Sequence, residues 1–151
     1  MGGMYFTALL CRNGHLITDN TEHSPEEVVK FCPDCGASTL SECRQCGTSI
    51  RGFHKEPGVL TFGYARPDFC HECGASYPWL AEAVASVREL AALTGNLSED
   101  ELIDLGRAVD DLVRETPRTK VAAARLKLLA PKVGAEAWGT IKEILVKVLT
   151  E

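Results

Sequence analysis

The residues best suited to chemistry in this chain are its seven cysteines, all of which lie between Cys11 and Cys73. Six of them form three pairs with the pattern C-x-x-C-G, at Cys32–Gly36, Cys43–Gly47 and Cys70–Gly74. Two cysteines three positions apart on a tight turn can direct both sulfurs at one metal ion, and the following glycine can adopt the positive φ that completes the turn. Three such pairs within 42 residues therefore predict metal binding.

A fourth pair is needed, because three pairs supply six ligands and two tetrahedral zinc ions require eight. Cys11 is the remaining cysteine, and Arg12-Asn13-Gly14-His15 follows it. Asn-Gly favours a turn, which places His15 where the second sulfur of a pair would stand. The sequence thus predicts two structural Zn²⁺ ions, one with three thiolates and an imidazole and one with four thiolates. The predicted ligands are Cys11, His15, Cys32, Cys35, Cys43, Cys46, Cys70 and Cys73.

The order in which the pairs combine is a separate prediction. A sequential arrangement joins Cys11 and His15 with Cys32 and Cys35, and joins the two later pairs with each other. Its spacers of 16 and 23 residues are long enough for the β-hairpin of a zinc ribbon. A cross-braced arrangement would join the first pair with the third and the second with the fourth, and a nested one would close Cys32–Cys46 around one ion. We favour the sequential arrangement, and the other two stay open.

Structural zinc is favoured over catalytic zinc, because a catalytic ion keeps an open position for water and both predicted sites can be closed by protein ligands. A redox C-x-x-C needs one exposed thiol of low pKa in a thioredoxin-like context, which three similar pairs do not resemble. No Ser/His/Asp or Cys/His arrangement stands out, and we expect His23, His54 and His71 to be loop or turn residues. We therefore expect that the protein is not an enzyme.

Two regions of different composition must position these residues. Residues 1–77 hold every cysteine and two short β-type runs, Tyr5–Leu10 and Gly58–Tyr64, whereas residues 78–151 are rich in Ala, Leu, Val, Glu and Arg. The predicted class is α+β, with an N-terminal double zinc ribbon of short hairpins and knuckles followed by a small α-helical C-terminal region.

About four helices are expected in the second region, from hydrophobic periodicity and end signals. Ser98 and Glu101 form the signature of a capping box, in which each residue satisfies a backbone N–H near the other. The expected helices are residues 78–93, a second from Ser98, a third from Thr116-Pro117 that Pro131 and Gly134 close, and a fourth from about residue 135 to the end.

The charge of the chain is mildly acidic, with a net charge of −5 and a pI near 5.4. Such a chain is not attracted to phosphate backbones by its overall field. One stretch differs, because residues 117–132 contain basic residues and no acid. We expect this stretch to attract the acidic helix before it, and the alternative is a basic patch for nucleic acid. Its basic residues are Arg118, Lys120, Arg125, Lys127 and Lys132.

The location of the protein is predicted from what the sequence lacks. Met1–His15 has neither the basic region nor the cleavage site of a signal peptide, and no stretch is long and apolar enough for a membrane span. We therefore expect a cytoplasmic protein. A reducing compartment also favours metal binding over disulfides for an odd number of cysteines.

Runs of residues around the ligands allow a family to be named. They are Tyr5–His15, Lys30–Ala37, Cys43–Cys46, Ile50–Gly52, Phe69–Gly74 and Tyr77–Trp79. With them the chain resembles, over residues 4–80, a family of small, uncharacterised bacterial zinc-ribbon proteins classed as a domain of unknown function. The resemblance implies a bacterial source and a tandem ribbon, and it implies no activity. We see no such resemblance in the helical tail.

The function that these observations favour is a non-catalytic adaptor, in which zinc holds a rigid surface and amphipathic helices or ribbon loops contact a protein partner. The loop between Cys46 and Cys70 offers Arg and aromatic residues in Ile50–His54 and Phe62–Arg66, which are typical of binding hot spots. The alternative is a nucleic-acid-binding zinc ribbon that uses residues 117–132. The last helix could also pair with a second copy of the chain.

Overall fold

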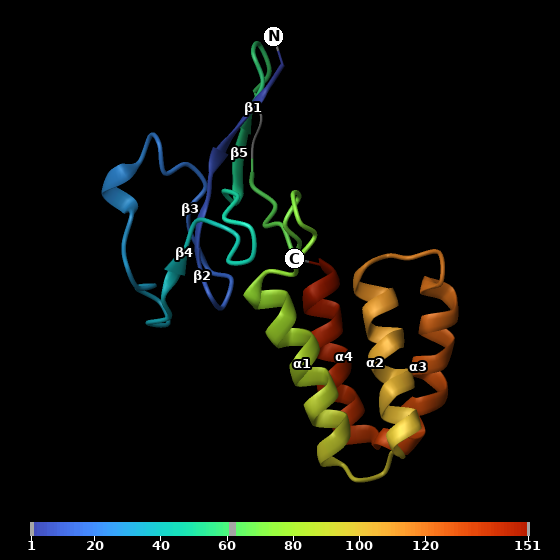
Figure 1. Ribbon diagram of the computed structural model, residues 1–151. Coiled ribbons are helices and arrows are strands. Elements are labelled where there is room, and N and C mark those ends of the chain that lie inside the picture. The colour runs from blue at the N-terminus through green and yellow to red at the C-terminus, as the bar shows by residue number, and fades with distance from the viewer. Residues whose placement is uncertain (1, 61–62, 151) are drawn as a thin grey trace. The chain divides into compact units, whose positions relative to one another are not determined.

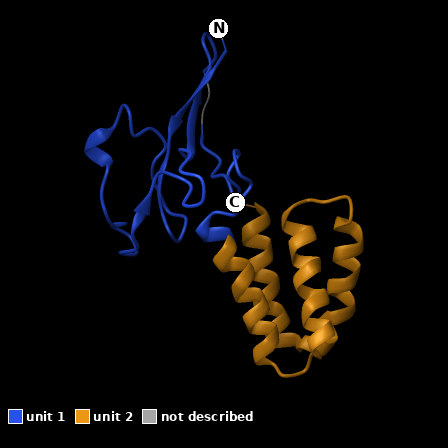
Figure 2. Ribbon diagram, in the orientation of Figure 1, with its two compact units in different colours: residues 1–80 blue, residues 81–151 orange. Residues whose placement is uncertain are grey.

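The computed structural model describes residues 2–60 and 63–150, and the chain divides into two compact units, residues 1–80 and residues 81–151 (Figure 2). Within the described residues, short antiparallel strands come first and four helices follow (Figure 1). The predicted α+β class is therefore confirmed.

The first unit contains two small antiparallel sheets. In one of them β2 lies between β3 and β4, and in the other β1 pairs with β5 alone. Between Pro25 and Glu27 the chain forms a single 3₁₀ turn, η1. The strands are β1 (Met4–Thr7), β2 (Leu9–Cys11), β3 (Leu16–Thr18), β4 (Thr39–Leu40) and β5 (Arg51–Lys55).

The predicted run Tyr5–Leu10 is divided at Ala8 between the two sheets. Ala8 is fully buried and its N–H donates to the carbonyl of Ile50, so the chain passes from one sheet to the other at a small residue. The predicted run Gly58–Tyr64 is not a strand in its described residues, because a turn with positive φ at Gly58 begins it; Thr61 and Phe62 lie outside the described residues. β3, β4 and β5 lie outside both predicted runs.

Each C-x-x-C-G motif forms the same small hairpin. The glycine has a φ of 75° or 76°, and its N–H donates to the carbonyl of the first cysteine at 2.8 or 2.9 Å. The N–H of the first cysteine donates to the carbonyl of the residue after the glycine, at 2.8 Å in all three hairpins. A serine one position further closes the hairpin through a β-bridge, in the pairs Phe31 with Ser38, Glu42 with Ser49, and Phe69 with Ser76.

The buried core of the first unit is small. Away from the cysteines it is made of a few large apolar side chains, and the longest strand in the unit has five residues. A unit of this size buries little apolar surface and needs another source of stability, such as metal binding. The large apolar residues in this core are Phe6, Leu9, Leu10, Leu40, Ile50, Tyr77, Trp79 and Leu80.

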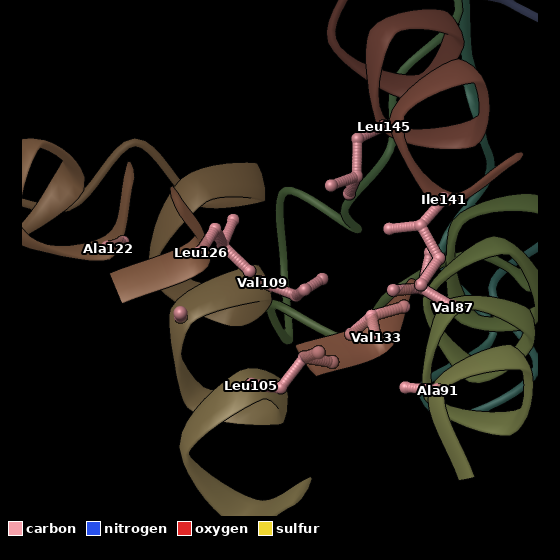
Figure 3. Close-up of a cluster of buried hydrophobic side chains, with 10 residues drawn as sticks. Val87, Ala91, Leu105, Val109, Ala122, Leu126, Val133, Ile141 and Leu145 are labelled. Carbon is pink, nitrogen blue, oxygen red and sulfur yellow. The ribbon is translucent and has the colours of Figure 1, made fainter. Parts of the chain in front are cut away.

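The helices are α1 (Pro78–Leu93), α2 (Glu99–Val113), α3 (Thr119–Val133) and α4 (Ala135–Thr150). One cluster of buried side chains joins all four (Figure 3). Leu105 and Val109 of α2, Val133 of α3 and Ile141 of α4 are among its members, and none is more than 2% exposed. The amphipathic pattern of the sequence therefore corresponds to one shared core. Among the described residues, no helix has both the length and the apolar composition that crossing a membrane requires.

Most helix ends follow the predictions, and the start of the third helix differs. The capping box is present, with Ser98 Oγ accepting from Glu101 N and the Glu101 carboxylate accepting from Ser98 N. The third helix begins at Thr119 instead of Thr116-Pro117, because Thr116 forms a turn in which its Oγ1 accepts from Arg118 N. The helix continues through Pro131 to Val133, which is buried in the shared core, and it ends at Gly134 as predicted.

Candidate metal centres

The first candidate centre is formed by Cys11, His15, Cys32 and Cys35. Their four ligand atoms all lie within 4.8 Å of one another. Cys11 Sγ is 3.7 Å from Cys35 Sγ and 3.4 Å from His15 Nδ1, and Cys32 Sγ is 3.7 Å from His15 Nδ1. A zinc tetrahedron with Zn–S bonds of about 2.3 Å has S···S edges of about 3.8 Å and slightly shorter S···N edges. The spacing of these atoms fits that tetrahedron.

The turn after β2 positions the first two of these residues. Cys11 N donates to the His15 carbonyl at 3.0 Å, and Gly14 N donates back to the Cys11 carbonyl at 2.9 Å. The N–H of His15 also points at Cys11 Sγ, 3.4 Å away. Asn13 extends from this turn and donates through Nδ2 to Cys35 Sγ at 3.3 Å. Sequence analysis assigned Asn13 only to the turn and missed this bond, which supports a thiolate of the other pair.

The second candidate centre is formed by Cys43, Cys46, Cys70 and Cys73, again with all ligand atoms within 4.8 Å of one another. Cys43 Sγ lies 3.6 Å from Cys73 Sγ, and Cys46 Sγ lies 3.6 Å from Cys70 Sγ. These distances fit a four-thiolate zinc site by the same comparison. The grouping in both centres is the sequential one, and neither the cross-braced nor the nested arrangement occurs.

Hydrogen bonds stabilise the thiolate form at several of these cysteines. The N–H of Ala37 lowers the pKa of Cys35 to about 6, with a further contribution from Asn13. The N–H groups of Cys73 and Glu72 lower the pKa of Cys70 to about 6. The Thr48 side chain lowers the pKa of Cys46, whose sulfur lies 3.3 Å from the Thr48 hydroxyl oxygen. Such bonds favour the charged form that binds metal.

Other cysteines in the same centres resist ionisation. Burial raises the pKa of Cys11. The N–H of Ala75 lowers the pKa of Cys73, but burial and the three neighbouring sulfurs outweigh it and raise the value to about 12. Several thiolates this close repel one another unless a cation lies between them. The donor set of each centre therefore fits a divalent, thiophilic cation, and no protein ligand position is missing from either tetrahedron.

Family membership follows from a comparison of the whole chain with known families. Residues 4–151 match a family described as "uncharacterized protein conserved in bacteria" (DUF2321). The chain belongs to this family. The match includes the helical tail, for which we had seen no resemblance in the sequence, so both units are part of the family's common architecture. No curated protein and no solved structure matches the chain.

One exposed surface combines arginine with aromatic rings, and we call it the Tyr5 patch: Tyr5, Arg51 and His54. Tyr5 and His54 lie opposite each other in β1 and β5, with ring centroids 4.4 Å apart. The guanidinium of Arg51 lies 4.3 Å from the centre of the Tyr5 ring, and Tyr5 is 48% exposed. Sequence analysis identified the segment Ile50–His54 but not Tyr5. Tyr5 reaches this segment only because β1 pairs with β5, which begins 46 residues later in the chain.

The basic residues of α3 lie beside the acidic residues of α2. Two ion pairs join the two helices, Lys132 with Glu101 at 2.7 Å and Arg125 with Asp104 at 3.7 Å. A third joins α2 to the residue directly before α3, Arg118 with Asp111 at 3.8 Å. Three of the five basic residues in 117–132 are thus engaged within the helical unit. This agrees with the expected attraction between adjacent helices.

Proposed function

We propose that this protein is a non-catalytic bacterial adaptor whose N-terminal unit is held together by two structural zinc ions and whose surface binds a protein partner. The observation that carries the proposal is the closed donor set of the two centres. Each has four protein ligands at distances that suit a tetrahedron, so that a bound ion would have no position left for a reacting water. Zinc here would supply folding energy and rigidity instead of chemistry. Zinc–thiolate sites of this kind are expected in the reducing cytoplasm, where we place the protein.

Support for a binding surface comes from the β1–β5 ribbon. The Tyr5 patch presents Arg and Tyr, two residue types enriched in binding hot spots. An open hollow of 610 Å³ also borders the ribbon, where Phe6, Phe53, Val59 and Leu60 contribute apolar lining. Leu60 is 85% exposed. An aromatic and apolar surface of this kind is typical of protein interaction sites.

The nucleic-acid alternative has less support. Three of the basic side chains that it requires are paired with α2, and the overall charge is −5. It predicts binding to DNA or RNA that falls steeply with salt. Reversing Lys120 and Lys127, which lie outside those three ion pairs, to Glu would abolish that binding if the alternative were correct.

The adaptor proposal is tested by affinity purification from the native host, with quantitative comparison of wild-type protein, Tyr5→Ala and Arg51→Ala. Leu128→Ala, which changes an exposed apolar residue of α3, is the matched control. We expect a defined set of proteins to be enriched by the wild type and the control and lost with both patch variants. An identical set with all four proteins would reject the Tyr5 patch as the interface.

A further inference from the structure

We propose that Arg66, Trp79 and Tyr77 form a bridge that couples the two metal sites, so that an ion in the four-cysteine site strengthens metal binding at the Cys11–His15 site. The inference rests on the proposed zinc-binding role of both centres. It assigns a positioning role to three residues that lie outside the ligand set.

The bridge begins at the turn between Cys11 and His15. Arg66 Nη1 donates to the Gly14 carbonyl at 2.9 Å. Gly14 lies directly before the ligand His15 and directly after Asn13, which bonds to the Cys35 sulfur. A guanidinium that holds this carbonyl therefore controls the direction in which both neighbours leave the turn.

Close packing at Gly14 distinguishes the Cys11–His15 turn from the three C-x-x-C-G turns. A Cβ at Gly14 would stand 2.3 Å from Arg66 Nη1 and 2.9 Å from Trp79 Cβ. At Gly36, Gly47 and Gly74 the corresponding position meets nothing within 4 Å. All four glycines have positive φ, so conformation alone does not distinguish them. Of these four described glycines, only Gly14 is packed tightly against residues 66–79.

The middle of the bridge is Trp79. The Arg66 guanidinium carbon lies 5.5 Å from the centre of its ring, and the indole N–H donates to the Pro67 carbonyl at 3.1 Å. Trp79 is thus bonded to the segment that leads into Cys70. The contacts of Trp79 with Arg66 and with the Pro67 carbonyl therefore depend on the backbone conformation of the segment before Cys70.

The far end of the bridge is Tyr77, whose ring stacks on Trp79 with centroids 4.9 Å apart. Its backbone N–H donates to the Asp68 carbonyl at 2.9 Å, two residues before Cys70. Tyr77 therefore joins Trp79 to the backbone directly before Cys70. The hydroxyl is buried and has no hydrogen-bond partner among the residues that the structure describes.

The two sites are coupled because residues 66–79 both supply ligands to the four-cysteine site and pack against the Cys11–His15 turn. When Cys43, Cys46, Cys70 and Cys73 are held by an ion, residues 66–79 are fixed at Cys70 and Cys73, and Arg66 and Trp79 are then preorganised against Gly14. The Cys11–His15 turn is then already ordered, so metal binding at the first centre loses less conformational entropy. Coupling of this kind is reciprocal, so each ion strengthens the binding of the other.

The test is a double-mutant cycle on the full chain, read by titration with Co²⁺, whose visible spectrum distinguishes a three-thiolate, one-imidazole site from a four-thiolate site. The first comparison is the affinity of the Cys11–His15 site with the other site intact and with Cys70→Ser/Cys73→Ser. We expect this change to weaken binding at least about fivefold, the lower end of typical coupling. The same comparison in an Arg66→Ala background should show little or no further loss.

The outcomes separate the possibilities. If breaking the four-cysteine site leaves the first affinity unchanged, or lowers it equally with and without Arg66, the bridge carries no coupling and the inference is wrong. A wild-type chain that binds fewer than two ions with thiolate character would instead contradict the proposed zinc module.

Gly14→Ala and Gly36→Ala provide an independent pair. Both add a methyl group at a positive φ in the first centre, but only the methyl group at Gly14 collides with Arg66 and Trp79. We expect Gly14→Ala to reduce the influence of the four-cysteine site on the first site, and Gly36→Ala to retain it. Equal coupling in the two variants would overturn the inference.

Discussion

His15 is the residue on which the ligand count depends, because it alone among the eight candidate ligands is not a cysteine. Its Nδ1 lies 3.4 Å from one sulfur and 3.7 Å from another, while the rest of the first centre consists of thiols. The other described histidines lie in neither centre. The structure thus brings together the histidine that completes the count with the three cysteines nearest to it.

Replacing His15 tests the first centre directly. We expect His15→Ala to lower the retained metal from about two ions per chain toward one under chelator competition, because a site with three thiolates and no fourth protein ligand binds zinc more weakly. His15→Cys should retain both ions. His71→Ala, in the hairpin between Cys70 and Cys73, is the control, and elemental analysis gives the stoichiometry. Full retention of two ions by His15→Ala would remove this residue from the ligand set.

Gly52 shows how a single position can limit the fold. A Cβ there would stand 2.0 Å from the Asp19 carbonyl oxygen and 2.9 Å from Ala8 N, both of them backbone atoms that cannot easily move. We expect Gly52→Ala to destabilise the first unit by about 2–4 kcal/mol, the range of severe packing defects. Gly139→Ala, on the exposed side of α4 with nothing within 4 Å, should be neutral or stabilise by about 0.5–1 kcal/mol. Denaturant unfolding of both variants checks the contrast.

The start of helix α2 is stabilised by a local motif that can be recognised in the sequence. Its capping box joins Ser98 and Glu101, and the Glu101 carboxylate also accepts from Lys132 of α3 at 2.7 Å. One residue therefore both caps a helix and joins two helices. A local motif and a tertiary contact stabilise the same end of α2.

The cap contributes measurable stability. We expect Ser98→Ala to cost about 1 kcal/mol in the unfolding free energy of the helical unit, because Glu101 N loses its acceptor. Ser86→Ala removes an exposed hydroxyl that bonds only to Glu82 O within α1, and it should cause no loss. Thermal unfolding followed by circular dichroism compares the two. Equal stability of Ser98→Ala and wild type would show that the cap is not needed.

The stability contribution of Glu101 should depend on pH. Hydrogen bonds from Lys132 and from the N–H of Ser98 lower the pKa of Glu101 below its ordinary value of 4.5. A group whose pKa is lower in the folded state stabilises the fold above its unfolded pKa, and this contribution is lost as pH falls through the folded value. Glu101→Gln should therefore be less stable than wild type at pH 7. The difference should shrink progressively as the pH falls below 4.5, when unfolding is measured across that range.

At the scale of the whole molecule, the two units obtain their stability in different ways. The helical unit has a continuous core drawn from all four helices (Figure 3). The first unit has short strands and few large apolar residues around its cysteine centres. Removal of metal should therefore affect the two units unequally.

We expect chelation to unfold residues 1–80 while α2–α4 remain protected. The physical reason is that metal binding supplies folding energy in the first unit and side-chain burial supplies it in the second. Hydrogen–deuterium exchange with and without chelator measures protection for each segment. Loss of protection in both units at the same chelator concentration would contradict this assignment.

Features formed by residues close together in the chain were predictable from the sequence, whereas features formed by distant residues were not. Helix α1 and the capping box of α2 follow from periodicity and end residues within a few turns. The start of α3 differs by a few residues because a local turn at Thr116 competes with helix. β5 and its partner β1 were not anticipated as a pair, since nothing in either segment identifies a strand so distant in the chain.

The sequence by itself determined which residues are candidate metal ligands, because each C-x-x-C-G pair is a local motif whose geometry is set by one turn and one glycine. It also determined the class of fold, since hydrophobic periodicity changes after residue 77. Only the tertiary structure decided that the pairs combine sequentially, that Asn13 supports a sulfur of the other pair, and that Arg66 and Trp79 hold the Gly14 turn. These contacts join residues 17 to 65 positions apart. Their formation depends on how the hairpins pack, which no local pattern encodes.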